Sequence, residues 1–273
     1  MYPKVKIKND RIASINRKHP WIFSRGVLDS DHCEEGDIVE IQSRKGQFLA
    51  IGYFQTGSIM LRILSFDNVE INQEFWNELI GKAIDCRSGL NLPSDHTDAY
   101  RLFHGEGDGA SGLIIDVYNS AVVIQCHTIG IHRQIKEIKT AVEVNLPQTS
   151  TIYDKSKSVL PPDYAHQVQN GFLKGEQSEI KILENGHQFI VDLSESQKTG
   201  FFLDQRENRK LLGEFCAGKK ILNLYCYTGG FSIYALENGA VSVTSIDASK
   251  QAVTLLDRNV SLTGRHDKHK SLL

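Results

Sequence analysis

A glycine-containing turn and one acidic residue could together bind a nucleoside. Residues 221–232 read ILNLYCYTGGFS, a buried strand that runs into a tight turn and opens a helix. Glycine at such a turn lets the backbone approach a ligand closely, because no Cβ stands in the way. Asp247 ends the next strand, and a carboxylate there can accept hydrogen bonds from both ribose hydroxyls. The pair predicts a ligand that contains adenosine.

The residues of the turn favour a ligand without phosphates. A dinucleotide requires G-x-G-x-x-G for its pyrophosphate, whereas this turn has only T-G-G. S-adenosylmethionine (SAM) carries no phosphate, and its sulfonium cation can lie near aromatic faces. The aromatic residues of the turn are Tyr225, Tyr227 and Phe231. The structural alternative is a plain strand-to-helix turn with Asp247 as a helix cap.

The hydrophobic periodicity predicts the elements that must position these residues. Up to residue 126 it indicates short strands of a small β-barrel over 36–66, a helix over 74–89 and a hairpin over 113–118 and 121–126. From there to residue 200 it indicates a helix over 131–146, a strand over 151–154, an irregular loop over 156–178 and a hairpin over 180–193. After residue 200 it indicates helices at 205–216, up to 236 and at 249–262, with strands at 221–224 and 241–246. This alternation predicts the start of a parallel, doubly wound sheet.

Several runs in the same order along the chain resemble a known enzyme family. They are HPWIFS at 19–24, GEGDGASGL at 105–113 with Asp116, IYD at 152–154, SQKTGFFLDQR at 196–206, NLYCYTGGFS at 223–232 and SIDAS at 245–249. Together they closely resemble the rRNA methyltransferases of the large subunit that methylate cytosine at C5. These are class I SAM enzymes with an N-terminal PUA domain. The resemblance covers nearly the whole chain.

The resemblance implies a multidomain protein of mixed α/β and α+β class. We expect a PUA-like, RNA-binding β-barrel over residues 1–68 and a central α+β domain over 69–178. Residues 179–273 are expected to form a β-hairpin and the first part of a Rossmann-like class I methyltransferase domain. The implied cofactor is SAM, the implied partner is 23S ribosomal RNA, and the implied reaction is methyl transfer to a base, in particular to cytosine C5.

The resemblance also implies which residues bind the cofactor, with the loop at 198–204 over the pocket. They are Lys198, Thr199, Phe202, Asp204, Tyr225, Tyr227, Thr228, Gly229, Gly230, Phe231, Asp247 and Ala248. Asp204 has a second interpretation, because with Glu207 it forms a D-x-x-E capping pattern for the following helix.

The charge distribution indicates where RNA would bind. The net charge of the chain is only −2. Residues 1–28 carry seven Lys or Arg against one Asp, a balance of +6, whereas residues 67–100 carry two against seven acids, a balance of −5. A basic end of this kind suits nucleic acid, although such termini are also often merely solvated. The candidate RNA contacts are Lys18, His19, Arg25 and Arg206.

For Trp21 and for a glycine-dense segment, we favour a structural role over ligand binding. Trp21 could stack on a base, but we expect it in the core of the barrel. The segment 105–112 is dense in glycine, yet Glu106 and Asp108 within it would repel a phosphate. We therefore predict a structural turn there.

Composition excludes several classes of protein. No apolar run approaches the roughly 18 residues that span a bilayer, and the N-terminus lacks the apolar segment of a secretory signal. Five cysteines are scattered without a C-x-x-C pair, which favours free thiols in a reducing compartment. We expect a cytoplasmic location, no membrane partner and no metal site.

The length raises doubt about activity. Only 75 residues follow Lys198 (273 minus 198), enough for two central parallel strands, whereas the family's domain needs about seven. C5 methylation also requires a cysteine thiolate that adds to the base, and neither the family's Asp-Pro-Pro nor its Ser-Cys-Ser occurs. We therefore name no catalytic residue and expect a C-terminally truncated chain that is inactive alone.

An unfinished sheet would leave an apolar edge and face, which predicts a homo-oligomer. A non-catalytic RNA-binding protein built on the PUA and central domains is the alternative function. A nucleotide-dependent oxidoreductase is a third, disfavoured because G-x-G-x-x-G is absent.

Overall fold

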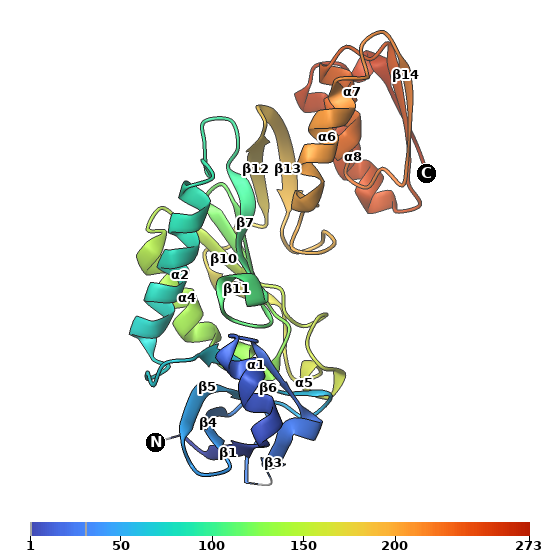
Figure 1. Ribbon diagram of the computed structural model, residues 1–273. Coiled ribbons are helices and arrows are strands. Elements are labelled where there is room, and N and C mark those ends of the chain that lie inside the picture. Colours follow the sequence, from blue (N-terminus) through green and yellow to red (C-terminus); the bar gives the residue numbers. More distant parts are fainter. Residues whose placement is uncertain (1, 31) are drawn as a thin grey trace. The chain divides into compact units, whose positions relative to one another are not determined.

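The computed structural model describes residues 2–30 and 32–273, which form two compact units (Figure 1). The first unit comprises Met1–Leu90, Arg101–Asp116 and Val122–Gly175, and the second comprises Asn91–Tyr100, Val117–Ala121 and Glu176–Leu273. The predicted domain boundaries after residues 68 and 178 stay predictions.

The N-terminal part of the first unit is a six-stranded sheet with the order β2-β6-β5-β4-β1-β3. Its strands are β1 (Lys4–Ile7), β2 (Trp21–Phe23), β3 (Val27–Asp29), β4 (Ile38–Ser43), β5 (Phe48–Phe54) and β6 (Ile59–Ser65), with helix α1 (Ile12–Asn16) between β1 and β2. In β1 charged and apolar residues alternate, so Val5 and Ile7 are buried and both lysines face solvent. The strands predicted over 36–66 are confirmed as β4 to β6, whereas β1 to β3 were missed.

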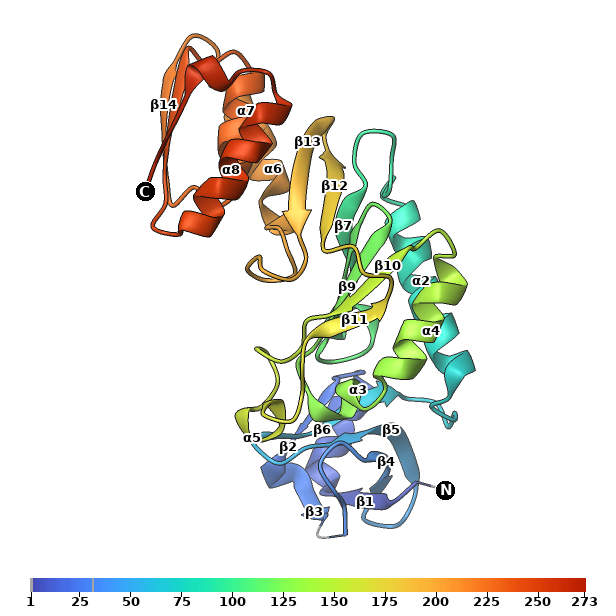
Figure 2. The ribbon, with the colours of Figure 1, turned by 180° about the vertical axis from the view of Figure 1, so that it is seen from behind.

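A five-stranded sheet with the order β11-β10-β9-β8-β7 lies mostly in the first unit, whereas residues 99–100, 117–118 and 121 of its strands are assigned to the second unit. These strands are β7 (Ala99–His104), β8 (Leu113–Tyr118), β9 (Ala121–Cys126), β10 (Thr151–Asp154) and β11 (Gly171–Lys174). Helices α2 (Gln73–Ser88) and α4 (Ile135–Asn145) pack against each other on one side of this sheet (Figures 1 and 2). Helix α2 begins where the Asn72 side chain accepts a hydrogen bond from the Phe75 amide, and it buries Trp76 and Ile80 at helical spacing.

Two predictions for this sheet are partly wrong. The helix expected over 131–146 is divided into α3 (Ile129–His132) and α4, because Gln134 leaves the helical conformation. The loop expected over 156–178 contains the short helix α5 (Pro162–Ala165) and the strand β11. Pro162 suits the first turn of α5, and β11 pairs with β10, a tertiary contact that the irregular composition concealed.

The second unit contains the predicted hairpin and a parallel sheet. Strands β12 (Glu179–Glu184) and β13 (His187–Asp192) turn at Asn185-Gly186, where both residues have positive φ, as a two-residue hairpin turn requires. The following elements are α6 (Arg206–Gly213), β14 (Lys220–Leu224), α7 (Gly230–Glu237), β15 (Ser242–Ile246), α8 (Lys250–Leu262) and β16 (His269–Leu272). The prediction of two parallel strands is wrong, because β16 pairs with β15 as a third. Its sequence, HKSL, is too short and polar to predict a strand.

Helices α7 and α8 pack on one face of the β14-β15-β16 sheet and separate it from the hairpin (Figure 2). Val243 and Ser245 of β15 point to this covered face and are buried. Leu222 and Leu224 of β14 point to the opposite face and are 61% and 54% exposed. A parallel sheet normally has both faces covered. Within the described residues, the exposure of the face that carries Leu222 and Leu224 is therefore unusual for such a sheet. No helix in the described ranges is long and apolar enough to cross a membrane.

Candidate functional site

The turn after β14 has the backbone geometry that its residues predict. Tyr225 and Tyr227 have φ of 55° and 49°, and Gly229, the N-cap of α7, has φ of 88°. A Cβ on Gly229 would lie 2.2 Å from Leu256 Cδ1 of α8. Glycine is therefore required here both by its left-handed conformation and by the close approach of a second helix.

Asp247 connects this turn to the beginning of α8. Its Oδ2 accepts a hydrogen bond from the Tyr227 amide at 2.8 Å, and its Oδ1 accepts one from the Ser249 amide at 2.9 Å. The helix cap itself is Ser249, whose hydroxyl accepts from the Ala252 amide. The alternative interpretation of Asp247 as the cap of α8 is therefore wrong, and its carboxylate lines a cavity instead.

This cavity, of about 540 Å³, lies where β14 and β15 end. It is lined by Gln197, Phe201, Phe202, Gln205, Arg209, Tyr225, Cys226, Tyr227, Thr228, Gly230, Phe231 and Asp247. Seven of the twelve predicted cofactor residues are in this set. Its volume falls within the roughly 300–1,000 Å³ of small-molecule sites.

The loop before α6 is held over the turn by the Tyr227 phenol. The Gln197 amide donates to the Tyr227 hydroxyl at 2.8 Å, and the Phe202 and Tyr227 rings meet edge to face with centroids 5.2 Å apart. Burial raises the pKa of Tyr227, so this hydroxyl stays protonated. On the inner side of the loop, the buried Thr199 hydroxyl hydrogen-bonds that of Tyr118 at 2.8 Å.

Arg209 and Glu184 form a buried ion pair that the sequence analysis missed. The Arg209 Nε and Nη2 donate to the two carboxylate oxygens of Glu184 at 2.7 and 2.6 Å, and the two residues are only 2% and 0% exposed. The guanidinium carbon lies 4.5 Å from the Phe201 ring centroid, and Arg209 lines the cavity. No sequence signal joins the pair, because β12 and α6 meet only in the folded unit.

The other predicted cofactor residues lie outside the cavity lining. Lys198, Asp204 and Ala248 are exposed, and Thr199 is buried. Gly229 is the N-cap of α7, where its backbone forms part of the turn. The capping role predicted for Asp204 is wrong, because α6 begins after Gln205 and no side chain caps it. Asp204 lies within the 3-10 turn Leu203–Gln205, so it lacks the extended backbone of an N-cap residue.

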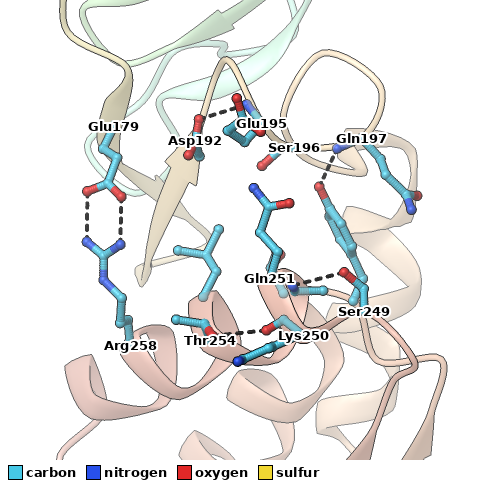
Figure 3. A pocket seen from close by; sticks show the side chains of 14 residues that line it. Glu179, Asp192, Glu195, Ser196, Gln197, Ser249, Lys250, Gln251, Thr254 and Arg258 are labelled. Carbon is cyan, nitrogen blue, oxygen red and sulfur yellow. Dashed lines mark hydrogen bonds and ion pairs between the residues drawn. The ribbon is translucent and has the colours of Figure 1, made fainter. Parts of the chain in front are cut away.

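A second cavity of about 540 Å³ adjoins the first and shares Gln197, Tyr227 and Thr228 with it. Figure 3 shows it between the hairpin and α8. On one side Arg258 donates to both carboxylate oxygens of Glu179 at 2.6 and 2.8 Å, which ties α8 to β12. On the other side Asp192 accepts from the Glu195 amide and orders the start of the loop.

The candidate RNA contacts are divided between the units. Lys18, His19 and Arg25 are exposed in the first unit, where Lys18 Nζ lies 4.5 Å from the Phe66 ring centroid. Arg206 begins α6 in the second unit and pairs with Glu207 at 3.0 Å.

Trp21 is half-buried and does not belong to the core of its sheet, so that prediction is wrong. Its neighbour Ile22 takes the core position because side chains alternate along a strand. The Trp21 indole nitrogen instead donates to Glu106 Oε1 at 2.9 Å and to Ser111 Oγ at 3.0 Å.

The described cysteines with a shifted pKa are all weaker acids than usual. Burial raises the pKa of Cys226 to about 11 and also raises the pKa of Cys33, Cys126 and Cys216. A thiolate nucleophile requires a lowered pKa, so none of these thiols has the required property. Within residues 2–30 and 32–273, no three His, Cys, Asp or Glu residues are grouped to hold a metal ion.

Comparisons with known proteins agree with this geometry. Residues 100–273 match the family model of S-adenosylmethionine-dependent methyltransferases, and residues 5–66 match the model of the PUA-like domain. A Streptococcus mutans protein assigned to the SAM-dependent methyltransferases has a similar structure, with a TM-score of 0.83, 26% identity and coverage of 99% of this chain and 70% of that one. A second solved structure, with a TM-score of 0.84, 26% identity and the same coverage, holds S-adenosylhomocysteine. The fold and the site thus define a PUA-like domain joined to a Rossmann-like methyltransferase domain that uses SAM.

Two curated relatives identify the family more specifically. Ribosomal RNA large subunit methyltransferase I of Photobacterium profundum is 33% identical over 270 residues, which cover 97% of this chain and 68% of the relative. The protein of the same name from Aeromonas hydrophila is 34% identical over 287 residues, which cover 100% and 72%. The chain therefore belongs to the S-adenosylmethionine-dependent methyltransferases, in the family of these proteins.

Proposed function

We propose that this protein transfers the methyl group of SAM to a base of large-subunit ribosomal RNA, with C5 of a cytosine in 23S rRNA as the target. The observation that carries the proposal is the cavity at the ends of β14 and β15, in a chain one third identical to proteins named for this reaction class. SAM supplies the electrophilic methyl group.

The residues around the cavity fit the parts of SAM by their chemistry. The Asp247 carboxylate would accept hydrogen bonds from the ribose hydroxyls. The rings of Tyr225, Tyr227 and Phe231 would lie near the sulfonium, which aromatic faces attract. Arg209 Nη1 would donate to the α-carboxylate of the methionine part, because a charge-assisted hydrogen bond favours that group.

The remaining predicted cofactor residues act indirectly in this proposal. Thr199 holds the loop and Gly229 shapes the turn, whereas Lys198, Asp204 and Ala248 lie at the exposed rim of the same segments. The nucleophile for C5 methylation is not assigned to any of the raised-pKa cysteines, since a thiolate must add to the base before the methyl group is transferred.

RNA binding is proposed for the first unit. Its PUA-like domain carries the basic residues Lys18, His19 and Arg25 within the N-terminal stretch of charge +6, and Arg206 would add a contact in the second unit. A target base in structured RNA would have to be flipped out of its stack to reach the methyl donor.

The activity of the 273-residue chain alone is a separate matter. Relatives align with almost all of it, so the comparisons do not support the predictions of truncation and inactivity. Incubation of the chain with rRNA and SAM labelled in its methyl group decides this, since label in the RNA would contradict the predicted inactivity. The homo-oligomer and the cytoplasmic location stay predictions.

Calorimetry with an acidic-residue variant tests the proposed cofactor site. We expect the chain to bind SAM but not NAD, and we expect Asp247→Ala to lower the affinity for SAM by about tenfold or more, because two hydrogen bonds to a carboxylate are lost. Glu214→Ala is the matched control, since it removes an exposed carboxylate of the same unit that does not line the cavity. Binding of NAD, or equal SAM affinity of both variants, would contradict the proposal.

A further inference from the structure

A third cavity, of about 320 Å³, lies in the first unit where the PUA-like sheet meets the five-stranded sheet. Trp21, Ile59 and Arg62 line it from β2 and β6, and His104, Glu106 and His127 are among the residues that line it from the second sheet. None of the proposed steps of methyl transfer uses this cavity. Its lining combines an aromatic ring, a guanidinium, two imidazoles and one carboxylate.

The indole of Trp21 is held rigidly in this wall. Its nitrogen donates to Glu106 Oε1 and to Ser111 Oγ, and the Ser111 carbonyl accepts from the Tyr53 hydroxyl at 2.7 Å. The hydroxyl of Thr128 donates in turn to Tyr53 at 2.9 Å. Both hydrogen bonds use the edge of the indole, and the His19 ring meets it at 77° with centroids 6.0 Å apart. The hydrogen bonds therefore leave the faces of the indole to ring contacts such as stacking.

The glycine-dense segment 105–112 builds the opposite side of the cavity. Gly112 has φ of +81°, and a Cβ on it would lie 2.9 Å from Thr128 Cγ2, so only glycine lets this segment pack there. The turn predicted from sequence is therefore real, and it also places Glu106 against Trp21.

Two acidic residues near the cavity are held in ion pairs. Asp108 is paired with Arg87, and Asp116 is paired with Arg101 at 2.9 Å. Arg101 Nη1 also donates to His104 Nδ1 at 3.2 Å. Glu106 remains inside, where it disfavours a phosphate but can accept from the N–H groups of a base.

We propose that this cavity binds one unpaired nucleotide of an RNA strand, with its base stacked on Trp21, its N–H groups near Glu106 and its phosphate near Arg62 and the exposed His127. Unpaired bases are recognised by stacking on aromatic rings together with hydrogen bonds to their edges. The inference rests on the proposed function in that the strand would belong to the RNA substrate.

Intrinsic fluorescence tests the contact directly, because the chain has two tryptophans and the other, Trp76, is 0% exposed. We expect a short single-stranded RNA that contains all four bases to quench the fluorescence of the full chain, and a duplex of the same sequence not to do so. Trp21→Phe should abolish the quenching while it retains most of the affinity, since the ring can still stack. Equal quenching by the duplex would overturn the requirement for an unpaired base.

Affinity, measured by the anisotropy of the same RNA carrying a fluorophore, provides the second readout. Stacking is worth about 1–3 kcal/mol per base, so Trp21→Ala should weaken binding by about fivefold to a hundredfold. Phe23→Ala is the control, because Phe23 is 44% exposed on the same strand but does not line the cavity. Arg62→Gln, which leaves the aromatic wall intact, should weaken binding and reduce its salt dependence by about one charge.

The outcomes separate this inference from the proposed function. RNA binding without quenching, or wild-type affinity in both Trp21→Ala and Arg62→Gln, would overturn the nucleotide site and leave the proposed function standing. Absence of RNA binding by the unaltered chain would overturn both. SAM affinity should be the same in all of these variants, since none lies in the methyltransferase unit.

Discussion

At the scale of single residues, the buried pair of Arg209 and Glu184 places a guanidinium beside the proposed cofactor cavity. Removing two charges from water costs several kcal/mol per ion, which only close, doubly hydrogen-bonded geometry can offset. Here the bidentate contact satisfies Nε and Nη2, and the Phe201 ring covers one side of the guanidinium. The pair therefore places the charged guanidinium of Arg209 at the cavity wall, with Nε and Nη2 bonded to Glu184 and Nη1 outside these two hydrogen bonds.

A double substitution, Arg209→Gln with Glu184→Gln, tests the role of that charge. It leaves no unpaired buried ion, so the unit should still fold. A hydrogen bond to a charged group is worth about 1.5–3 kcal/mol, so we expect about a tenfold to hundredfold loss of SAM affinity by calorimetry. The affinity for 5′-methylthioadenosine, which lacks the amino-acid part of SAM, should not change.

Arg206→Gln is the matched control, because Arg206 lies on the same helix, pairs with the exposed Glu207 and does not line the cavity. Equal losses for SAM and methylthioadenosine in the double variant would assign the pair a purely structural role.

At the scale of elements, the junction of β14 with α7 depends on the close approach of α8 to Gly229. We expect Gly229→Ala to destabilise the cofactor-free protein by about 2–4 kcal/mol, because the left-handed conformation and the displaced Leu256 both contribute. Gly218→Ala should cost only about 1–2 kcal/mol, since Gly218 has φ of +72° but no atom within 4 Å of the added Cβ. Urea denaturation measures the free energy of unfolding of both variants. Equal losses in the two variants would mean that Leu256 of α8 can move aside without an energetic cost.

We expect the third strand, β16, to make the second unit sensitive to acid. Burial lowers the pKa of His269, although Asp257 of α8 opposes the shift, and the ring nitrogen Nε2 lies 2.8 Å from the Ser245 hydroxyl. The unfolded chain therefore binds this proton at higher pH than the folded one does. Stability should be complete above about pH 6.5 and fall as the pH decreases towards the folded pKa, by at most about 1.4 kcal/mol per pH unit.

Urea midpoints measured from pH 8 to pH 5 would reveal this dependence. His269→Gln should flatten that part of the profile because it has no proton to bind. An equally steep profile in the variant would attribute the acid sensitivity to other groups.

At the scale of the whole molecule, the parallel sheet has one covered face and one exposed apolar face. Leu222 and Leu224 are the large exposed apolar side chains of β14, and Phe215, nearby in sequence, is 67% exposed. Large exposed apolar patches favour association. The predicted homo-oligomer would bury this kind of surface.

Replacement of Leu222 and Leu224 by threonine tests that prediction. Because both side chains are already exposed, the free energy of unfolding should change by no more than about 0.5 kcal/mol per site. Sedimentation velocity should show less self-association than in the unaltered chain. A large loss of stability, or association that does not change, would contradict this account of the exposed face.

The sequence by itself determined the features that depend on neighbouring residues. The Asn185-Gly186 hairpin, the glycine turn before α7 and the acid at the end of β15 were all predicted correctly, because positive φ and strand ends restrict residue types locally. The runs that resemble the methyltransferase family are likewise short stretches of residues adjacent in sequence.

Only the tertiary structure decided which distant side chains meet. Arg209 reaches Glu184 across 25 positions and Trp21 reaches Glu106 across 85, and neither pair has a period or motif in the sequence. Strand β16 was missed for the same reason, since its four residues are a strand only because β15 offers them a partner. Hydrogen-bond partners depend on where sheets and helices place the chain in space, and the sequence carries that information only as a whole.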